Sequence, residues 1–277
     1  MAIVAVGQIC STISMAHNLS QCRLLVQKAV AAGAKALFLP EASDYIAPTA
    51  SETVSSVRPA SSSPFVQGLQ ASAREHNLPI NVGIHEPSSK HENKVINSLV
   101  WINADGQIEH RYQKLHLFDV DIPGGPTLQE SNSVEKGTEI LAPFPTAVGN
   151  VGLLICFDLR FPEPSISLRR QGAHIITYPS AFTAATGRAH WSALLRARAI
   201  ETQSYVVAAA QVGSHNDKRT SYGHSMIVSP WGDIVAELGG EKKDEPEIAV
   251  GEIDLERMEK IRKEMPLLRR TDVYPEV

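Results

Sequence analysis

The residue with the clearest chemical potential is Cys156, which ends the apolar run "VGLLIC" and is followed directly by the polar-rich "FDLRFPE". A thiol at a strand end, just before a turn into a helix, projects from a sheet, and nearby helical N–H groups can lower its pKa. A free cysteine is, however, most often a small core hydrophobe. A catalytic thiol also needs a base to take its proton and donors to stabilise an oxyanion.

Two other strand ends carry side chains that could meet those needs. Glu41 follows the apolar "ALFLP", which places a carboxylate where a strand leaves the core; taken alone, it could equally cap a helix or lie in a loop. Lys114 closes the alternating segment "IEHRYQK", and lysine is common at exposed strand edges. By themselves, these residues leave both readings open.

Length and composition indicate a globular protein with a substantial core. The chain has 277 residues, 43% of them apolar, and a formal net charge of −4, so no basic excess points to nucleic acid. Cys10, Cys22 and Cys156 lie far apart, without spacing for zinc or a disulfide framework. No signal peptide or membrane-length apolar run is visible. We expect a cytoplasmic protein of one domain, 1–277, with a tail at about 266–277, and no membrane or nucleic-acid partner.

Hydrophobic periodicity predicts alternating strands and helices. Expected strands are 2–9, 35–39, 78–86, 96–103, 107–114, 174–180, 204–210, 223–230, 233–238 and 247–254. Expected helices cover about 19–30, a segment from 63–64 onward, 161–171, 189–203 and 255–264. A hairpin is expected to turn at Gly149–Asn150, and Pro48–Ser63 to form a surface loop. The pattern indicates the α/β class, with two helix-covered sheets packed together.

Three segments tie the candidate residues together. "LFLPE" around Glu41, "YQKLHLFD" around Lys114 and "CFDLRFPE" around Cys156 resemble, in the same order, the three signatures of the nitrilase superfamily of carbon–nitrogen hydrolases. The resemblance implies an αββα four-layer sandwich with Glu41 as general base, Lys114 as oxyanion donor and Cys156 as nucleophile. Glu130 occupies the place of a second glutamate that many members carry; otherwise it is a solvated loop residue.

The implied chemistry is amide hydrolysis through a thioester. Lys114 and the backbone N–H of Phe157 would hold the oxyanion. Because Glu41 must act as base and then acid, we expect its pKa to be raised. No metal or other cofactor is implied, since the histidines show no metal spacing.

The second half, including "ITYPSAFTAATGRAHW" and "DKRTSYGHSMIVSPWG", resembles the deaminated glutathione amidase branch of this superfamily. That resemblance implies hydrolysis of the 2-oxoglutaramyl amide bond of deaminated glutathione to 2-oxoglutarate and cysteinylglycine, a metabolite repair reaction. One alternative is an ω-amidase acting on 2-oxoglutaramate or 2-oxosuccinamate. Another is a binding or scaffold protein that kept the fold and lost turnover.

A 2-oxo acid carboxylate needs a cationic partner, and Arg160, four residues after the thiol, is the candidate. Its alternative role is an ion pair with Asp158 or Glu163. Phe182 and Thr186 could wall the pocket or merely pack their loop. Arg219 or Lys218, in the polar loop Gly213–Gly223, could meet a distal carboxylate or remain solvated. The family resemblance also implies a homodimer or higher oligomer, and an alternative start could add a mitochondrial pool.

Overall fold

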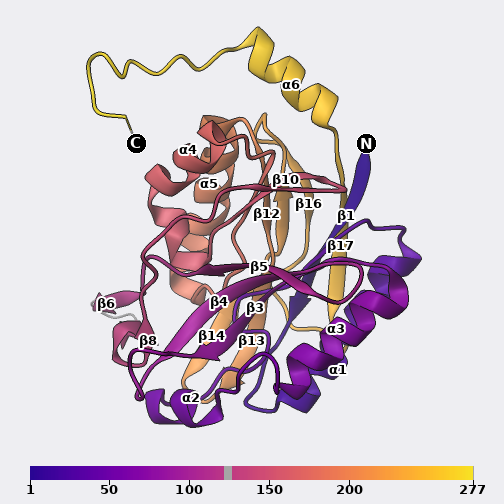
Figure 1. Cartoon of the computed structure of the whole chain (residues 1–277), viewed down its shortest axis with the longest axis vertical. Helices are drawn as coiled ribbons and strands as arrows, with labels where there is room; N and C mark the ends of the chain where they lie inside the picture. Colours follow the sequence, from indigo (N-terminus) through magenta and orange to yellow (C-terminus); the bar gives the residue numbers. More distant parts are fainter. Residues whose placement is uncertain (122–126, 277) are drawn as a thin grey trace.

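The computed structural model describes residues 1–121 and 127–276, and these form four layers. Helices α1 (Met15–Ala31) and α3 (Pro64–His76) lie on one side, and α4 (Pro162–Arg170) and α5 (Ala184–Thr202) lie on the other, with the sheets between them (Figure 1). The predicted αββα sandwich is confirmed.

The first sheet has the strand order β14-β13-β1-β2-β3-β4-β5, with β17 paired to β1 and β8 paired to β4. Its strands are β1 Ala2–Ile9, β2 Leu37–Phe38, β3 Ile80–Pro87, β4 Val95–Ile102, β5 Ile108–Gln113, β8 Val134–Glu135, β13 Ala210–Asn216, β14 Arg219–Tyr222 and β17 Glu247–Ile253. Antiparallel and parallel pairs occur together, as the mixture of hairpins and strand–helix alternations predicted.

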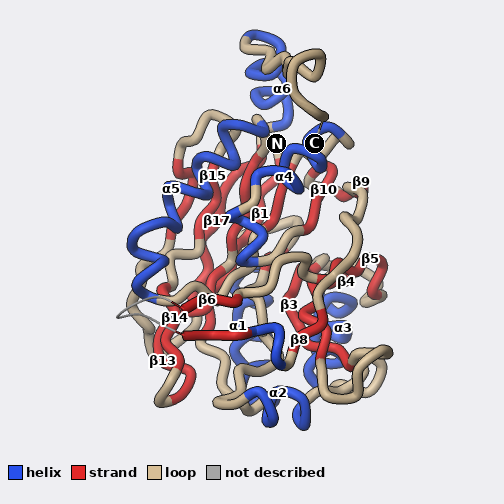
Figure 2. Tube along the Cα trace, turned by 90° about the vertical axis from the view of Figure 1, so that its left-hand side faces the viewer, coloured by secondary structure: helices blue, strands red, loops and turns tan. Residues whose placement is uncertain are grey.

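The second sheet has the order β16-β15-β12-β11-β10-β9. Its strands are β9 Phe144–Thr146, β10 Gly149–Leu153, β11 Ile175–Thr177, β12 Tyr205–Ala208, β15 Met226–Val228 and β16 Ile234–Glu237. A separate ribbon pairs β6 (Asp119–Asp121) with β7 (Thr127–Gln129). The tube in Figure 2 shows α4 and α5 running alongside this sheet.

Side-chain alternation explains why both faces of the first sheet are covered. Along β1, Val4 and Val6 belong to the core between the sheets, whereas Ala5 and Ile9 belong to the core against α1 and α3. Successive side chains of a strand point to opposite faces, so a nearly continuous apolar strand contributes to both cores. Polar residues near the ends of the strands of this sheet, among them Gln8, Asn97 and Gln211, are buried as well.

Most predicted elements are present, and two have the expected bounds: β1 at Ala2–Ile9 and α6 at Leu255–Glu264. The expectation of a loop over Pro48–Ser63 was wrong in part, because α2 (Ala50–Ser56) forms there. Thr49 caps this helix by accepting a hydrogen bond from the backbone N–H of Glu52. The Ser/Thr-rich stretch therefore contains a helix cap, Thr49, followed by a short helix, which its composition alone does not indicate.

Three further boundaries differ from the prediction. The β9–β10 hairpin turns at 147–148, two residues before Gly149–Asn150, because Gly149 already pairs with Thr146. Helix α5 begins at Ala184, not near Ala189. The segment Gly213–Gly223 is not a loop: most of it lies in the β13–β14 hairpin, which places Arg219 on a strand.

The C-terminal tail continues beyond α6 and returns toward α4 and α5 (Figure 1), where Arg269 donates to the Glu201 carbonyl and Glu276 pairs with Arg170. The last residue of the expected tail, Val277, lies outside the described residues. Across 1–121 and 127–276, none of the helices combines the length and apolar character needed to cross a bilayer.

Candidate active site

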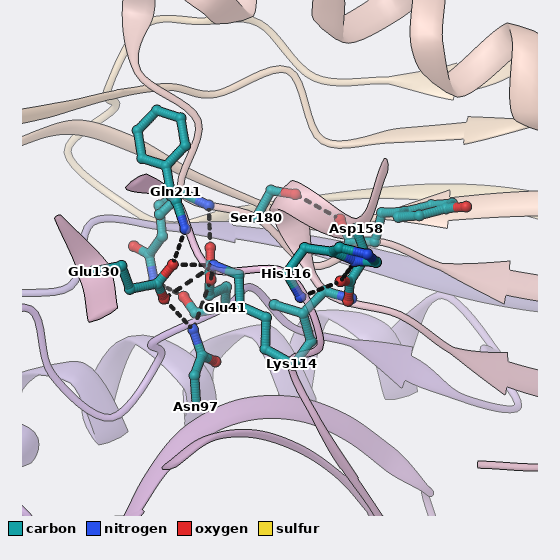
Figure 3. A network of polar contacts seen from close by, with 12 residues as sticks. Glu41, Asn97, Lys114, His116, Glu130, Asp158, Ser180 and Gln211 are labelled. Carbon is teal, nitrogen blue, oxygen red and sulfur yellow. Dashed lines mark hydrogen bonds and ion pairs between the residues drawn. The ribbon is translucent and has the colours of Figure 1, made fainter. Parts of the chain in front are cut away.

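Lys114 lies directly after β5 and is held there by its backbone, which donates to the Asn97 carbonyl on β4 at 3.0 Å. Its side chain is buried, and Nζ lies 2.8 Å from Glu41 Oε1 and 3.0 and 2.9 Å from Glu130 Oε1 and Oε2. Figure 3 shows these side chains converging. An ammonium group has three protons, so all three are directed at carboxylate oxygens.

Glu41 is placed by the loop that leaves β2. The backbone of β3 approaches so closely that a Cβ on Gly83 would lie 2.5 Å from Glu41 Cα, which explains a glycine at this position. Glu41 Oε2 accepts from the Ala181 backbone N–H at 2.9 Å, and Oε1 accepts from Asn97 Nδ2 at 2.8 Å. The Glu41 carbonyl accepts from Gln211 Nε2 at 2.9 Å. The carboxylate is therefore fixed on every side.

Cys156 follows β10 and begins a short 3₁₀ helix, Cys156–Arg160. Its φ of +44° lies in the left-handed region, which a side-chain-bearing residue adopts at an energetic cost. Its backbone N–H donates to the Pro179 carbonyl at 3.0 Å. The strained turn directs the thiol into hydrogen-bonding reach of the Glu41 carboxylate.

Burial and charge set the protonation states of the three groups. Burial raises the pKa of Glu41, but the Lys114 ammonium and its hydrogen bond outweigh it, so the pKa is lowered to about 2. Burial and the Glu41 charge raise the pKa of the Cys156 thiol. Burial lowers the pKa of Lys114, but Glu130 and Glu41 reverse that effect and raise it. The expected raised pKa of Glu41 was therefore wrong: the resting state is carboxylate, thiol and ammonium.

Asp158 is fully buried and connects the thiol segment to the lysine segment. Its Oδ1 accepts from the backbone N–H of His116 at 3.0 Å and from His116 Nδ1 at 2.8 Å. Its Oδ2 accepts from the Tyr112 hydroxyl at 2.7 Å and from the Ile155 N–H at 3.0 Å. The His116 ring also stacks on Phe161, with centroids 3.7 Å apart. His116 is thus a structural histidine.

A pocket of about 540 Å³ opens on this cluster. All of the residues proposed from the sequence for the site line it: Glu41, Lys114, Glu130, Cys156, Phe157, Arg160, Phe182, Thr186, Lys218 and Arg219. Segments far apart along the chain therefore meet around one cavity. No group of histidine, cysteine, aspartate and glutamate side chains in residues 1–121 and 127–276 could hold a metal ion.

Arg160 does not form the ion pair with Asp158 or Glu163 that the sequence left open. Its guanidinium carbon lies 5.6 Å from the Phe157 ring centroid and 5.5 Å from that of Phe182, a cation–π arrangement. Nη1 lies 3.3 Å from Nδ1 of His190. Within the described parts of the chain, this cation has no carboxylate partner, so it remains available to an anionic ligand.

Phe182 and Thr186 form the wall beside Arg160. Phe182 is buried and packs on Trp191, with ring centroids 4.9 Å apart. The Thr186 hydroxyl lies 2.9 Å from that of Thr183, so it already has a local partner. Arg188 is exposed on α5, and the structure assigns it no contact in the pocket.

Two site residues were missed from the sequence, Asn97 and Gln211. Asn97 Nδ2 donates to both Glu41 and Glu130, the latter at 3.2 Å, and Gln211 holds the backbone beside Glu41. Each is a buried amide near the start of a strand of the first sheet. A polar amide at such a position was the available signal, since most buried side-chain amides have hydrogen-bond partners.

The fold and the cluster together define a class of protein: an αββα hydrolase in which a thiol, a carboxylate and an ammonium surround one pocket. Residues 3–263 match the model of the family described as carbon–nitrogen hydrolase, and the chain belongs to that family. Its activity is hydrolysis of carbon–nitrogen bonds in amides other than peptide bonds.

Similar proteins span the whole chain. A Schizosaccharomyces pombe protein called probable hydrolase nit2 is 48% identical, with 100% of each chain covered. Human deaminated glutathione amidase is 44% identical over 99% of this chain and 84% of that protein. The crystal structure of the Caenorhabditis elegans NitFhit protein matches with a TM-score of 0.91 and 39% identity, covering 99% of this chain and 66% of that longer one.

Proposed function

We propose that this protein hydrolyses the 2-oxoglutaramyl amide bond of deaminated glutathione, giving 2-oxoglutarate and cysteinylglycine. The observation that carries the proposal is the convergence of Cys156, Glu41 and Lys114 on a pocket in which Arg160 has no carboxylate partner among the described residues. The similarity to deaminated glutathione amidases of several animals supports the substrate.

Acylation begins with proton transfer from the Cys156 thiol to the Glu41 carboxylate. Because the pKa of the thiol is raised and that of the carboxylate is lowered, a free thiolate is disfavoured. The transfer therefore accompanies attack of sulfur on the amide carbonyl, so the negative charge passes directly to the carbonyl oxygen.

Lys114 stabilises this oxyanion by turning one of its N–H groups from a carboxylate oxygen to the carbonyl oxygen of the substrate. Its contact with Glu130 Oε2 is the one that can be released, because that oxygen also accepts from the Phe118 N–H at 2.7 Å. The contact with Glu41 then remains. The backbone N–H of Phe157, in the first turn of the 3₁₀ helix, is the second donor. Glu130 thus supports the lysine without touching the reacting atoms.

Collapse of the tetrahedral intermediate breaks the carbon–nitrogen bond. Protonated Glu41 transfers its proton to the departing amine, which leaves as neutral cysteinylglycine, and Cys156 retains the acyl group as a thioester. A water molecule then attacks the thioester while Glu41 accepts its proton. Release of 2-oxoglutarate returns that proton to sulfur, so each turnover consumes one water and restores the resting enzyme.

Recognition of the acyl half falls to Arg160, whose planar guanidinium can bind the 2-oxo acid carboxylate through two parallel hydrogen bonds. The rings of Phe157 and Phe182 hold the group in place, and Thr186 adds a hydroxyl to the same wall. At the other end, Arg219 and Lys218 of the β13–β14 hairpin line the pocket, and we propose Arg219 for the distal glycine carboxylate.

Three broader proposals accompany this function. The chain is one catalytic domain over residues 1–277, it acts as a homodimer or higher oligomer, and it works in the cytoplasm. Gel filtration with light scattering tests the second, and localisation of the tagged full-length protein tests the third.

A substrate panel with the purified protein tests the activity. It comprises deaminated glutathione, 2-oxoglutaramate, 2-oxosuccinamate, a simple nitrile and an N-carbamoyl amino acid. We expect kcat/KM to be highest on deaminated glutathione. Preference for 2-oxoglutaramate or 2-oxosuccinamate would make the protein an ω-amidase. A folded protein that turns over none of them and whose thiol ignores iodoacetamide at neutral pH would be a binding protein.

A further inference from the structure

We propose that His85 forms a leaving-group subsite, in which its ring nitrogen Nε2 hydrogen-bonds a polar group on the amine that departs from the scissile amide. The inference rests on the proposed function for the identity of that amine, a short peptide. It assigns His85 a role in selecting N-substituted amides that carry a polar substituent close to the nitrogen.

The strand register places His85 in one row with the catalytic cluster. On β3 it lies directly opposite Asn97 of β4, and the backbone of Asn97 in turn binds that of Lys114. Residues directly opposite in an antiparallel pair share a face, with Cβ atoms about 5 Å apart. His85 therefore lies beside the amide that binds both carboxylates, and it lines the same pocket.

Asp44 fixes which nitrogen of His85 is available. Asp44 is buried, and its Oδ1 accepts from His85 Nδ1 at 2.9 Å while Oδ2 accepts from the His85 backbone N–H at 2.8 Å. A carboxylate only accepts, so Nδ1 carries a proton. Within the described residues, Nε2 makes no hydrogen bond. A ring held by a buried acid, with its second nitrogen unused in a pocket, is suited to bind a ligand.

Packing holds the ring rigidly. The His85 ring lies against that of Tyr45, with centroids 4.4 Å apart, and the Tyr45 hydroxyl donates to the Thr53 carbonyl of α2 at 2.7 Å. The side chain of His85 is only 10% exposed, so little freedom remains to be lost on binding.

The chemistry identifies the half of the substrate that His85 meets. Glu41 protonates the departing nitrogen, so the leaving amine must lie on the side of Glu41, whereas Arg160 and Phe182 wall the acyl side. On the Glu41 side, β3 packs against the Glu41 backbone at Gly83, and His85 follows two residues later on the same face. His85 is thus a polar side chain placed next to the leaving amine.

The test compares three amides of 2-oxoglutarate, in which the nitrogen is unsubstituted, N-propyl or N-cysteinylglycyl. The key readout is the ratio of kcat/KM for the peptidyl amide to that for the N-propyl amide, since the two differ in polar groups on the leaving side. His85→Asn keeps an amide N–H near Nδ1 for Asp44 and removes the distal arm, whereas His85→Gln places an amide near Nε2. His110→Asn is the matched control, because His110 stacks on Phe144 outside the pocket.

We expect His85→Asn to lower this ratio about tenfold, the effect of losing one good hydrogen bond, and His85→Gln to recover part of it. The inhibition constant of cysteinylglycine should rise in parallel, with that of 2-oxoglutarate less affected. His110→Asn should leave the ratio unchanged. Equal losses on the peptidyl and N-propyl amides, in a variant with wild-type circular dichroism, would overturn the subsite. A wild-type enzyme that cleaves only the primary amide would instead reject the proposed function as well as this inference.

Discussion

The carboxylate of Asp158 binds both the main chain and the ring of His116, through the same oxygen, at 3.0 and 2.8 Å (Figure 3). Asp158 lies two residues after Cys156, and His116 lies two residues after Lys114. This contact therefore links the two segments that carry the nucleophile and the ammonium. Their spacing depends on a residue that does not itself touch the pocket.

Replacing this carboxylate should be costly. In Asp158→Ala, two buried donors, the Tyr112 hydroxyl and the Ile155 N–H, and two partly buried donors of His116 lose their acceptor. Each unsatisfied buried group costs about 1–3 kcal/mol. We expect the free energy of unfolding to fall by about 4 kcal/mol and turnover to be lost, as measured by urea denaturation and ammonia or amine release. Asp233→Ala, at an exposed ion pair with Arg257, should change stability by less than about 0.5 kcal/mol. Similar stability in the two variants would contradict the linking role.

Two substitutions of Cys156 should separate the loss of activity from the effect of backbone strain on stability. Both Cys156→Ala and Cys156→Gly lack the nucleophile, so neither should release product. Because φ is +44° at this position, glycine adopts the turn without the cost that alanine incurs, and Cys156→Gly should be the more stable of the two by about 1 kcal/mol. Thermal and urea unfolding measure the difference. Ammonia release from a folded Cys156→Ala protein would refute the nucleophile.

Asn97 should control the charge balance of the cluster without contributing a charge. Asn97→Asp adds a third carboxylate next to Glu41 and Glu130, and repulsion raises the pKa of Glu41. A higher pKa means that Glu41 is protonated, and unable to act as base, at a higher pH, so the acidic limb of the kcat/KM profile should move upward.

A second test replaces Asn97 by alanine, and its control is Asn81, a buried amide on β3 whose Nδ2 donates to the Val100 carbonyl at 3.1 Å. Asn81→Ala and Asn97→Ala should lose comparable stability, but only Asn97→Ala should lower kcat at neutral pH. Loss of kcat in both variants would indicate that any buried amide in this sheet matters equally.

How far the sequence predicts this site depends on the range of the interactions involved. Strand ends mark Glu41, Lys114 and Cys156, because apolar runs and their polar termini are local features. The role of Asn97 could not be predicted from the sequence, because it depends on the contacts of its side chain with Glu41 and Glu130, which are distant along the chain. The low pKa of Glu41 likewise depends on a 2.8 Å contact with a lysine that is 73 positions away in the chain.

The predicted boundaries of helices and strands are wrong where the composition of a segment and its local hydrogen bonds indicate different structures. The Ser/Thr-rich stretch before α3 has the composition of a loop, yet the capping hydroxyl of Thr49 is sufficient to start α2. In the Gly213–Gly223 segment, polar residues suggested a solvated loop, but β13 and β14 pair with each other across the turn and make it a hairpin. In both cases local hydrogen bonds, which the polar composition does not reveal, decide the structure.

Arg160 should affect binding of acidic amides selectively. Arg160→Ala removes the guanidinium that faces the pocket, so KM for 2-oxoglutaramate should rise at least about tenfold, whereas KM for a neutral aliphatic amide of similar length should change little. Arg160→Lys should recover less than half of the lost binding energy because ammonium cannot bind carboxylate in the bidentate manner. Equal effects on the acidic and neutral amides would mean that Arg160 only supports the aromatic wall.

Glu130 should set the alkaline limit of activity. In the wild type, Glu41 has a lowered pKa and both Cys156 and Lys114 have raised ones, so all three keep their resting states and kcat/KM should be flat from about pH 5 to 9. Glu130→Gln removes the largest of the charges that raise the pKa of Lys114. The pKa of Lys114 then falls, the ammonium is lost at lower pH, and kcat/KM should decline at the alkaline end of that range. Glu139→Gln, an exposed glutamate outside the pocket, controls for the change in net charge and should keep the wild-type profile. An unchanged profile for Glu130→Gln would show that Glu41 alone maintains the charge of Lys114.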